Sequence, residues 1–146
     1  MIRFLMTSIF LLMAAASATA APTCKNWDGV PAGMKGYITS YIFGVDPQDR
    51  TNSRGAALGS ALALIQQDRA NMHRFNAGGY LDEWDGYFTE LDRRSRISNA
   101  DLRTWCDGSV GDIERIMLDA RFQNHYIVDV FAEGSRLVLF VTVLAG

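Results

Sequence analysis

The stretch that decides the fold lies at the C-terminus, 125-HYIVDVFAEGSRLVLFVTVLAG-146. It contains two runs rich in β-branched and aromatic residues, 126–131 and 136–144. A Glu-Gly-Ser turn signal at 133–135 separates the two runs. This pattern predicts a β-hairpin over about residues 125–144.

The predicted hairpin needs a partner, because a two-stranded sheet is marginally stable by itself in water. Its second strand is also too short to cross a bilayer as a helix. Two interpretations stay open. The hairpin covers a helical core, or the uncharged run 137-LVLFVTVL-144 pairs as an exposed edge with another chain.

Working outward toward the N-terminus, two helix starts precede the hairpin. In 109-SVGDIERIMLDARF-122, Ser109 is placed to cap a helix and an acid follows three residues later. In 98-SNADLRTWC-106, Ser98 has the same arrangement. The spacing predicts a short helix that ends near Cys106 and is followed at once by a second helix.

Three further segments have apolar residues at helical spacing. They are 32-AGMKGYITSYIFGV-45, 56-AALGSALALIQQDRANMHRF-75 and 79-GYLDEWDGYFTELDRR-94. Together with the later helices they place helical structure over about residues 32–122. The sequence therefore predicts a mainly α fold, a small helical bundle stapled by one disulfide with a C-terminal β-hairpin.

The first 20 residues, MIRFLMTSIFLLMAAASATA, have the pattern of a signal peptide. Arg3 is followed by an apolar run and then by Ala18-x-Ala20, which signal peptidase accepts. Pro22 and Thr23 before the first cysteine do not fit a lipoprotein signal. We expect cleavage after residue 20 and a single exported domain, residues 21–146, in the periplasm or outside the cell.

The charge balance argues against nucleic-acid binding. Loss of residues 1–20 removes one arginine and no acid, which leaves 13 basic and 16 acidic residues. The densest basic stretch, 92-DRRSR-96, is short and is better explained as a solvated helix end. No apolar run after the signal peptide is long enough for stable membrane insertion.

The chain has two cysteines, Cys24 and Cys106. In an oxidising compartment they are expected to form one structural disulfide, since only one pairing exists. A redox pair is disfavoured by their distance in sequence. A catalytic pair with His73 or His125 has no local signature, and these four residues lack the spacing of a metal site. No cofactor is predicted.

Three stretches resemble the small periplasmic HdeA-type acid-stress chaperones and the similarly built toxin-immunity proteins. They are 24-CKNW-27, 36-GYITSYIFGV-45 and 102-LRTWCDGSVGDIERIMLDA-120. The matching positions are Cys24, Trp27, Tyr37, Ile38, Tyr41, Ile42, Gly44, Trp105 and Cys106. The chain departs from these families in having Asp-Gly after Cys106 and in its hairpin tail. The resemblance implies a helical, disulfide-linked periplasmic protein.

On this resemblance the expected function is a non-enzymatic periplasmic binding protein, most simply a stress or acid chaperone. The alternative is an immunity or inhibitor protein that neutralises one toxin or enzyme. The expected partner is a protein, an unfolded client or a second copy of the chain. Neither Gly-x-Ser-x-Gly, a phosphate loop nor His-Glu-x-x-His occurs, so no enzyme activity is predicted. The candidate core or binding aromatics are Trp27, Tyr37, Tyr41, Trp84 and Trp105.

Overall fold

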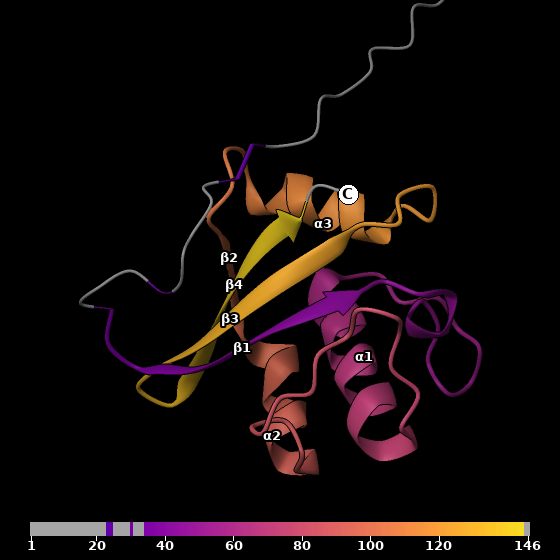
Figure 1. Cartoon of the computed structure of the whole chain (residues 1–146), viewed down its shortest axis with the longest axis horizontal. Helices are drawn as coiled ribbons and strands as arrows, with labels where there is room; N and C mark the ends of the chain where they lie inside the picture. Colours follow the sequence, from indigo (N-terminus) through magenta and orange to yellow (C-terminus); the bar gives the residue numbers. More distant parts are fainter. Residues whose placement is uncertain (1–22, 25–29, 31–33, 145–146) are drawn as a thin grey trace, which may run out of the picture.

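Four strands form one mixed sheet, ordered β1-β3-β4-β2, in the computed structural model of the chain (Figure 1). The structure describes residues 23, 24, 30 and 34–144. The strands are β1 Tyr37–Gly44, β2 Asp101–Thr104, β3 His125–Glu133 and β4 Arg136–Leu144. Neighbours β1, β3 and β4 are antiparallel, whereas β2 runs parallel to β4. The edges are therefore β1 and β2.

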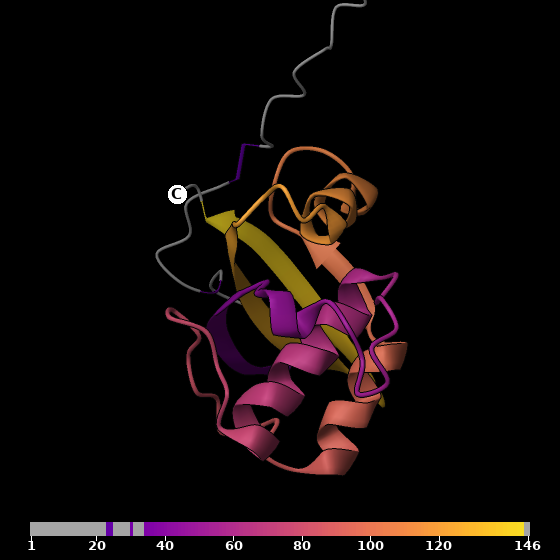
Figure 2. The ribbon, with the colours of Figure 1, turned by 90° about the vertical axis from the view of Figure 1, so that its right-hand side faces the viewer.

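The α-helices are α1 Ala61–Phe75, α2 Leu91–Ser95 and α3 Val110–Leu118, with 3-10 turns η1 Pro47–Asp49 and η2 Arg96–Asn99. Figure 2 shows the helices beside the sheet. The main core joins Leu64 of α1 and Met117 of α3 to Val128 of the sheet, all fully or almost fully buried. A smaller cluster around Phe131 and Phe140 occupies the other face of the sheet.

The predicted mainly α fold is wrong, because the sheet holds about as much of the chain as the helices do. The segment 32–45, predicted as a helix, contains β1 instead. Its buried residues Tyr41 and Phe43 alternate with the less buried Ser40 and Ile42, which is the period of a strand. The segment also has apolar residues at helical spacing, and its pairing with β3 is what makes it a strand. The helical fold implied by the family resemblance is corrected by the same observation.

Two other predicted helices are also wrong. Most of 79–94 is an irregular loop, and only Leu91–Ser95 is α-helical. The segment 98–106 contains β2, whose residues pair with Val138–Val141 of β4. Ser98 does not cap a helix, since its hydroxyl donates a hydrogen bond to the Ser95 carbonyl. A local capping signal was outweighed by strand pairing.

The hairpin prediction is confirmed, and the hairpin forms the centre of the sheet. β3 and β4 pair along their length through a Gly134-Ser135 turn in which Gly134 has φ 62°, as the first residue of a type II′ turn requires. On their outer sides, β3 pairs with β1 and β4 pairs with β2. The helix at 109–122 is confirmed as α3, and Ser109 and Asp112 form the predicted capping box.

The predicted disulfide between Cys24 and Cys106 is present. Cys106 lies between β2 and α3, not at the end of a helix, and Asp107 N–H donates to the Thr23 carbonyl beside it. The bond attaches the described part of the N-terminal segment to the sheet. The predicted signal peptide, residues 1–20, and Trp27 lie outside the described residues. No helix among those residues combines the length and the hydropathy needed to cross a membrane.

Candidate functional site

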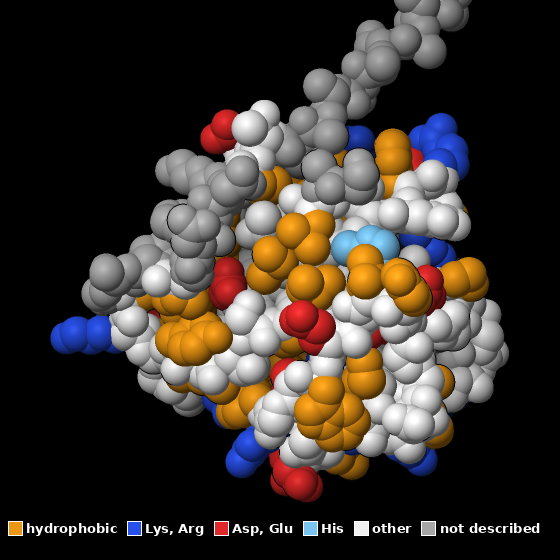
Figure 3. Space-filling view, viewed as in Figure 1, with side chains coloured by type: hydrophobic (Ala, Val, Ile, Leu, Met, Phe, Trp, Pro, Cys, Tyr) orange, Lys and Arg blue, Asp and Glu red, His pale blue; other side chains and the backbone are white. Residues whose placement is uncertain are grey.

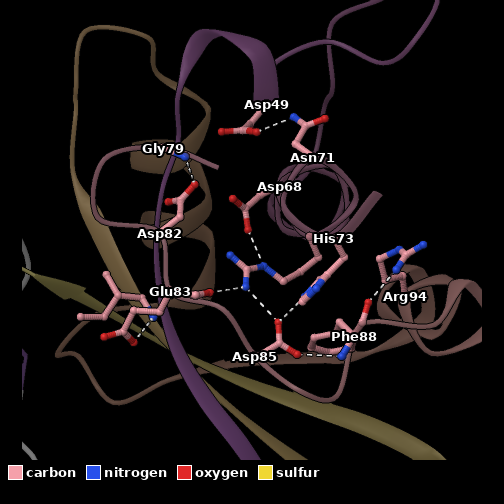
Figure 4. A network of polar contacts seen from close by, with 12 residues as sticks. Asp49, Asp68, Asn71, His73, Gly79, Asp82, Glu83, Asp85, Phe88 and Arg94 are labelled. Atoms are coloured by element: carbon pink, nitrogen blue, oxygen red, sulfur yellow. Dashed lines mark hydrogen bonds and ion pairs between the residues drawn. The ribbon is translucent and has the colours of Figure 1, made fainter. Parts of the chain in front are cut away.

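A buried ionic cluster lies between α1, β1 and the loop 76–90, which joins α1 to α2 (Figure 4). We define it as Asp68, Arg69, His73 and Asp85. The side chains of all four are at most 1% exposed. Helix α1 supplies three of them, and the loop supplies Asp85. The cluster therefore attaches the loop to the helix.

Arg69 is the centre of this cluster. Its Nε donates to Asp68 Oδ2 at 2.6 Å, and one terminal nitrogen donates to Asp85 Oδ2 at 2.9 Å and to the Glu83 carbonyl at 2.8 Å. Its guanidinium carbon lies 4.1 Å from the ring centroid of Tyr41 in β1. A buried guanidinium with two carboxylates and an aromatic face has the partners that a desolvated charge requires.

Asp85 organises the end of the loop. Its Oδ2 lies 2.7 Å from His73 Nε2, while its Oδ1 accepts the backbone N–H groups of Tyr87 and Phe88 at 3.0 and 2.7 Å. One carboxylate thus joins helix α1 to the turn that buries the Phe88 ring. Loss of this carboxylate would release both the ionic contacts and the turn.

The two aspartates of the cluster differ in their preferred protonation. Burial raises the pKa of Asp68 well above its ordinary value, and the charge of Arg69 offsets only part of that effect. Burial also acts to raise the pKa of Asp85. There, however, hydrogen bonds from Phe88 N–H, His73 and Arg69 outweigh it and lower the pKa. Arg69 therefore has two carboxylate partners, of which Asp85 keeps its negative charge more readily than Asp68 does.

Four buried polar atoms here have no hydrogen-bond partner within the described residues. They are Tyr41 Oη, Asp68 Oδ1, Arg69 Nη2 and His73 Nδ1. An Asp–His pair resembles half of a nucleophilic catalytic site, but no hydroxyl or thiol of the described residues contacts Nδ1 of this histidine. The ring is instead packed against Trp84, with centroids 4.3 Å apart. The geometry favours a structural role for the cluster.

The same loop also covers part of the β1 edge. Glu83 Oε2 accepts the Ile42 N–H at 3.0 Å, and Glu83 N–H donates to the Ile42 carbonyl at 2.8 Å. Asp82 Oδ1 accepts the Gly44 N–H at 2.7 Å. Acidic side chains thus satisfy backbone donors that an edge strand otherwise leaves unpaired. The loop is fixed on two sides although it has no regular secondary structure.

The fixed loop presents large apolar side chains to solvent. Tyr80 is 96% exposed, Trp84 60% and Leu81 46%, and Phe75 at the end of α1 is also exposed. We call these four residues the aromatic surface. Figure 3 shows hydrophobic side chains in several groups with acidic ones between them. Segment 76–90 carries four acids and no lysine or arginine, so the loop part of this surface combines apolar side chains with negative charge. At its other end the guanidinium carbon of Arg74 lies 5.0 Å from the Phe75 ring centroid.

The predicted aromatic residues do not share one site. Tyr41 is buried under Arg69, and Tyr37 is half-exposed beside Phe131. Trp105 stacks on Phe140 at a centroid distance of 3.8 Å, and its Nε1 donates to Asp129 Oδ2 at 3.0 Å. Phe131 and Phe140 contact each other, with ring centroids 5.6 Å apart, so Tyr37 and Trp105 belong to one aromatic cluster on the sheet. Tyr41 and Trp84 lie outside that cluster.

Sequence reasoning missed Asp68, Arg69 and Asp85 as a group, and considered His73 only together with the cysteines, as a catalytic partner or a metal ligand. The sequence contains only a weak signal for this cluster. Arg69 and His73 are four residues apart and share one face of α1, but a charged pair of this kind usually faces solvent. Their burial depends on Asp85, which reaches them from a loop whose course the sequence does not predict.

No protein-family model, no curated protein and no solved structure matches the chain. Within the described residues, no group of three or more histidine, cysteine, aspartate or glutamate side chains is placed to hold a metal ion.

Proposed function

We propose that the protein is a non-enzymatic binding protein of an oxidising, extracytoplasmic compartment, and that it binds one dedicated protein partner through the aromatic surface. The observation that carries this proposal is the exposure of Trp84 and Tyr80 on a loop that buried ion pairs hold in place. Tryptophan and tyrosine are the residues most often found at the energetic centre of protein interfaces. An already ordered loop also loses little conformational entropy on binding.

The acids of segment 76–90 define the chemistry of the partner. Glu83 and Glu90 of this segment are exposed, and no basic residue lies in the segment. A folded partner with a basic, partly apolar surface would complement this charge pattern. An immunity or inhibitor protein that blocks one toxin or enzyme fits this description. The disulfide and the N-terminal signal-peptide pattern support the compartment.

Affinity capture of a partner by the wild-type protein, repeated with matched variants, tests this function. The purified oxidised protein is immobilised and exposed to the secreted and periplasmic proteins of its own host. A partner held by the wild type is then measured against Tyr80→Ala and Trp84→Ala, with Phe122→Ala as a control at an exposed aromatic outside the loop. We expect the loop variants to weaken binding by at least about tenfold. Equal binding by all four proteins, or no saturable partner, would refute the proposal.

A second candidate, an acid-stress chaperone, is favoured by the charge composition of the buried cluster. Strong acid would neutralise Asp85 and leave Arg69 buried among neutral neighbours, since the pKa values of Tyr41 and Asp68 are raised by burial. An uncompensated buried cation favours opening of the loop. Apolar-dye binding and suppression of client aggregation, followed from pH 7 to pH 2, test this candidate. A compact protein without dye binding at pH 2 would eliminate it.

A further inference from the structure

A hollow of about 320 Å³ lies where η2 approaches the β3–β4 turn. It is lined by Arg96, Asn99, Ser135, Arg136 and Leu137. Its volume falls at the lower end of the range for small-ligand sites, roughly 300–1,000 Å³. Two segments far apart in sequence build it, so the hollow is a product of the tertiary fold.

Arg96 is held in a fixed position at this hollow. Its two terminal nitrogens donate to Tyr87 Oη and to the Ser135 carbonyl, each at 2.9 Å. A guanidinium has five N–H donors, so donors remain for a ligand after these two bonds. The side chain has already lost much of its rotational freedom, which lowers the entropic cost of binding an anion.

Arg136 supplies a second positive charge. The residue is exposed, and its side chain makes no hydrogen bond or ion pair within the part of the chain that the structure describes. Glu133 is close enough to interact with it electrostatically, but both Glu133 oxygens accept hydrogen bonds from Arg103, at 2.8 and 3.0 Å. The carboxylate nearest to Arg136 in the turn is therefore already paired, and the hollow keeps an excess of positive charge.

We infer that this hollow is a binding site for an oxyanion, the carboxylate or phosphate group of a small ligand. Arg96 and Arg136 provide charge-assisted hydrogen bonds, the strongest type available to an oxyanion. The Asn99 amide and the Ser135 hydroxyl add neutral donors. The buried Leu137 side chain supplies an apolar wall for the remainder of the ligand. The site does not depend on the function proposed for the loop.

Titration of the ¹⁵N-labelled oxidised protein with inorganic phosphate and, separately, with acetate tests the inference by NMR. Chloride at the same ionic strength is the control for general screening. We expect saturable shifts at the amides of Asn99, Ser135 and Arg136 with at least one oxyanion. The oxyanion that saturates at the lower concentration identifies the preferred group.

Arg136→Gln is the decisive variant, because this side chain braces no other part of the structure. It should weaken oxyanion binding by about tenfold or more. Arg54→Gln, at an exposed arginine in a different loop, should bind like the wild type. Shifts no larger than those with chloride, or equal loss in the two variants, would overturn the inference. Unchanged binding by Arg136→Gln would overturn it as well.

Discussion

Replacement of Asp85 by asparagine tests whether the buried ionic cluster holds the loop 76–90 in place. Asparagine has the same shape, and its Oδ1 can still accept the N–H groups of Tyr87 and Phe88. Its amide nitrogen, however, would face the Arg69 and His73 donors that Oδ2 now accepts at 2.9 and 2.7 Å. The substitution therefore removes a charge and leaves the turn-forming oxygen.

The expected cost follows from these contacts. Removing one partner of a buried ion pair costs about 3–5 kcal/mol, since the remaining charge stays desolvated. Asp68 remains bonded to Arg69, and His73 can change tautomer to accept from the new amide, so the cost should lie near the lower limit. We expect a loss of about 3 kcal/mol in the free energy of unfolding at pH 7. That is a large share of the 5–15 kcal/mol of a typical domain.

Urea unfolding of the oxidised protein, followed by tryptophan fluorescence and circular dichroism, measures this change. Asp92→Asn is the matched control, because Asp92 is exposed in the first turn of α2 and its replacement should change stability by less than about 1 kcal/mol. If Asp85→Asn lost less than about 1 kcal/mol, or no more than the control, the cluster would not be what holds the loop.

Three other predictions concern pH, capping and the disulfide. Burial raises the pKa of Asp49 to about 6. The folded state therefore binds this proton more tightly than the unfolded state does, and its contribution should make the protein more stable as the pH falls from above 6 toward 4. Asp49→Asn should remove this part of the pH dependence in urea titrations. Below pH 4, protonation of Asp85, whose pKa is lowered, should reduce stability again. Ser109→Ala should cost about 1 kcal/mol and Ser98→Ala clearly less, because only Ser109 caps a helix; equal losses would contradict the assigned caps. Reduction of the bond between Cys24 and Cys106, 82 residues apart, should lower the free energy of unfolding by about 2–4 kcal/mol, which a comparison of urea midpoints with and without reductant would check.

The sequence by itself determined the elements whose signals are local and strong. The hairpin at 125–144 has two long β-rich runs around a Gly-Ser turn, which is the pattern typical of two paired strands. Helix α3 combines a Ser-Asp capping box with apolar residues such as Ile113 and Met117 at helical spacing, whereas the capping signal at Ser98 did not produce a helix. The disulfide followed from there being two cysteines in a chain with a signal-peptide pattern.

Tertiary structure decided the rest, because the competing local signals were close in strength. The segment 37–44 has apolar residues at both helical and alternating spacing, and only the open edge of β3 makes it a strand. Residues 98–101 have the sequence of a capped helix start, but residues 101–104 form a strand because they pair with the open edge of β4. The candidate site depends on contacts between distant segments. Arg69 and His73 can be buried only because Asp85 and Glu83 of the loop 76–90 accept their hydrogen bonds. The oxyanion hollow likewise exists only because η2 lies beside the β3–β4 turn. Contacts between residues distant in sequence depend on the whole fold, so no local pattern could have predicted them.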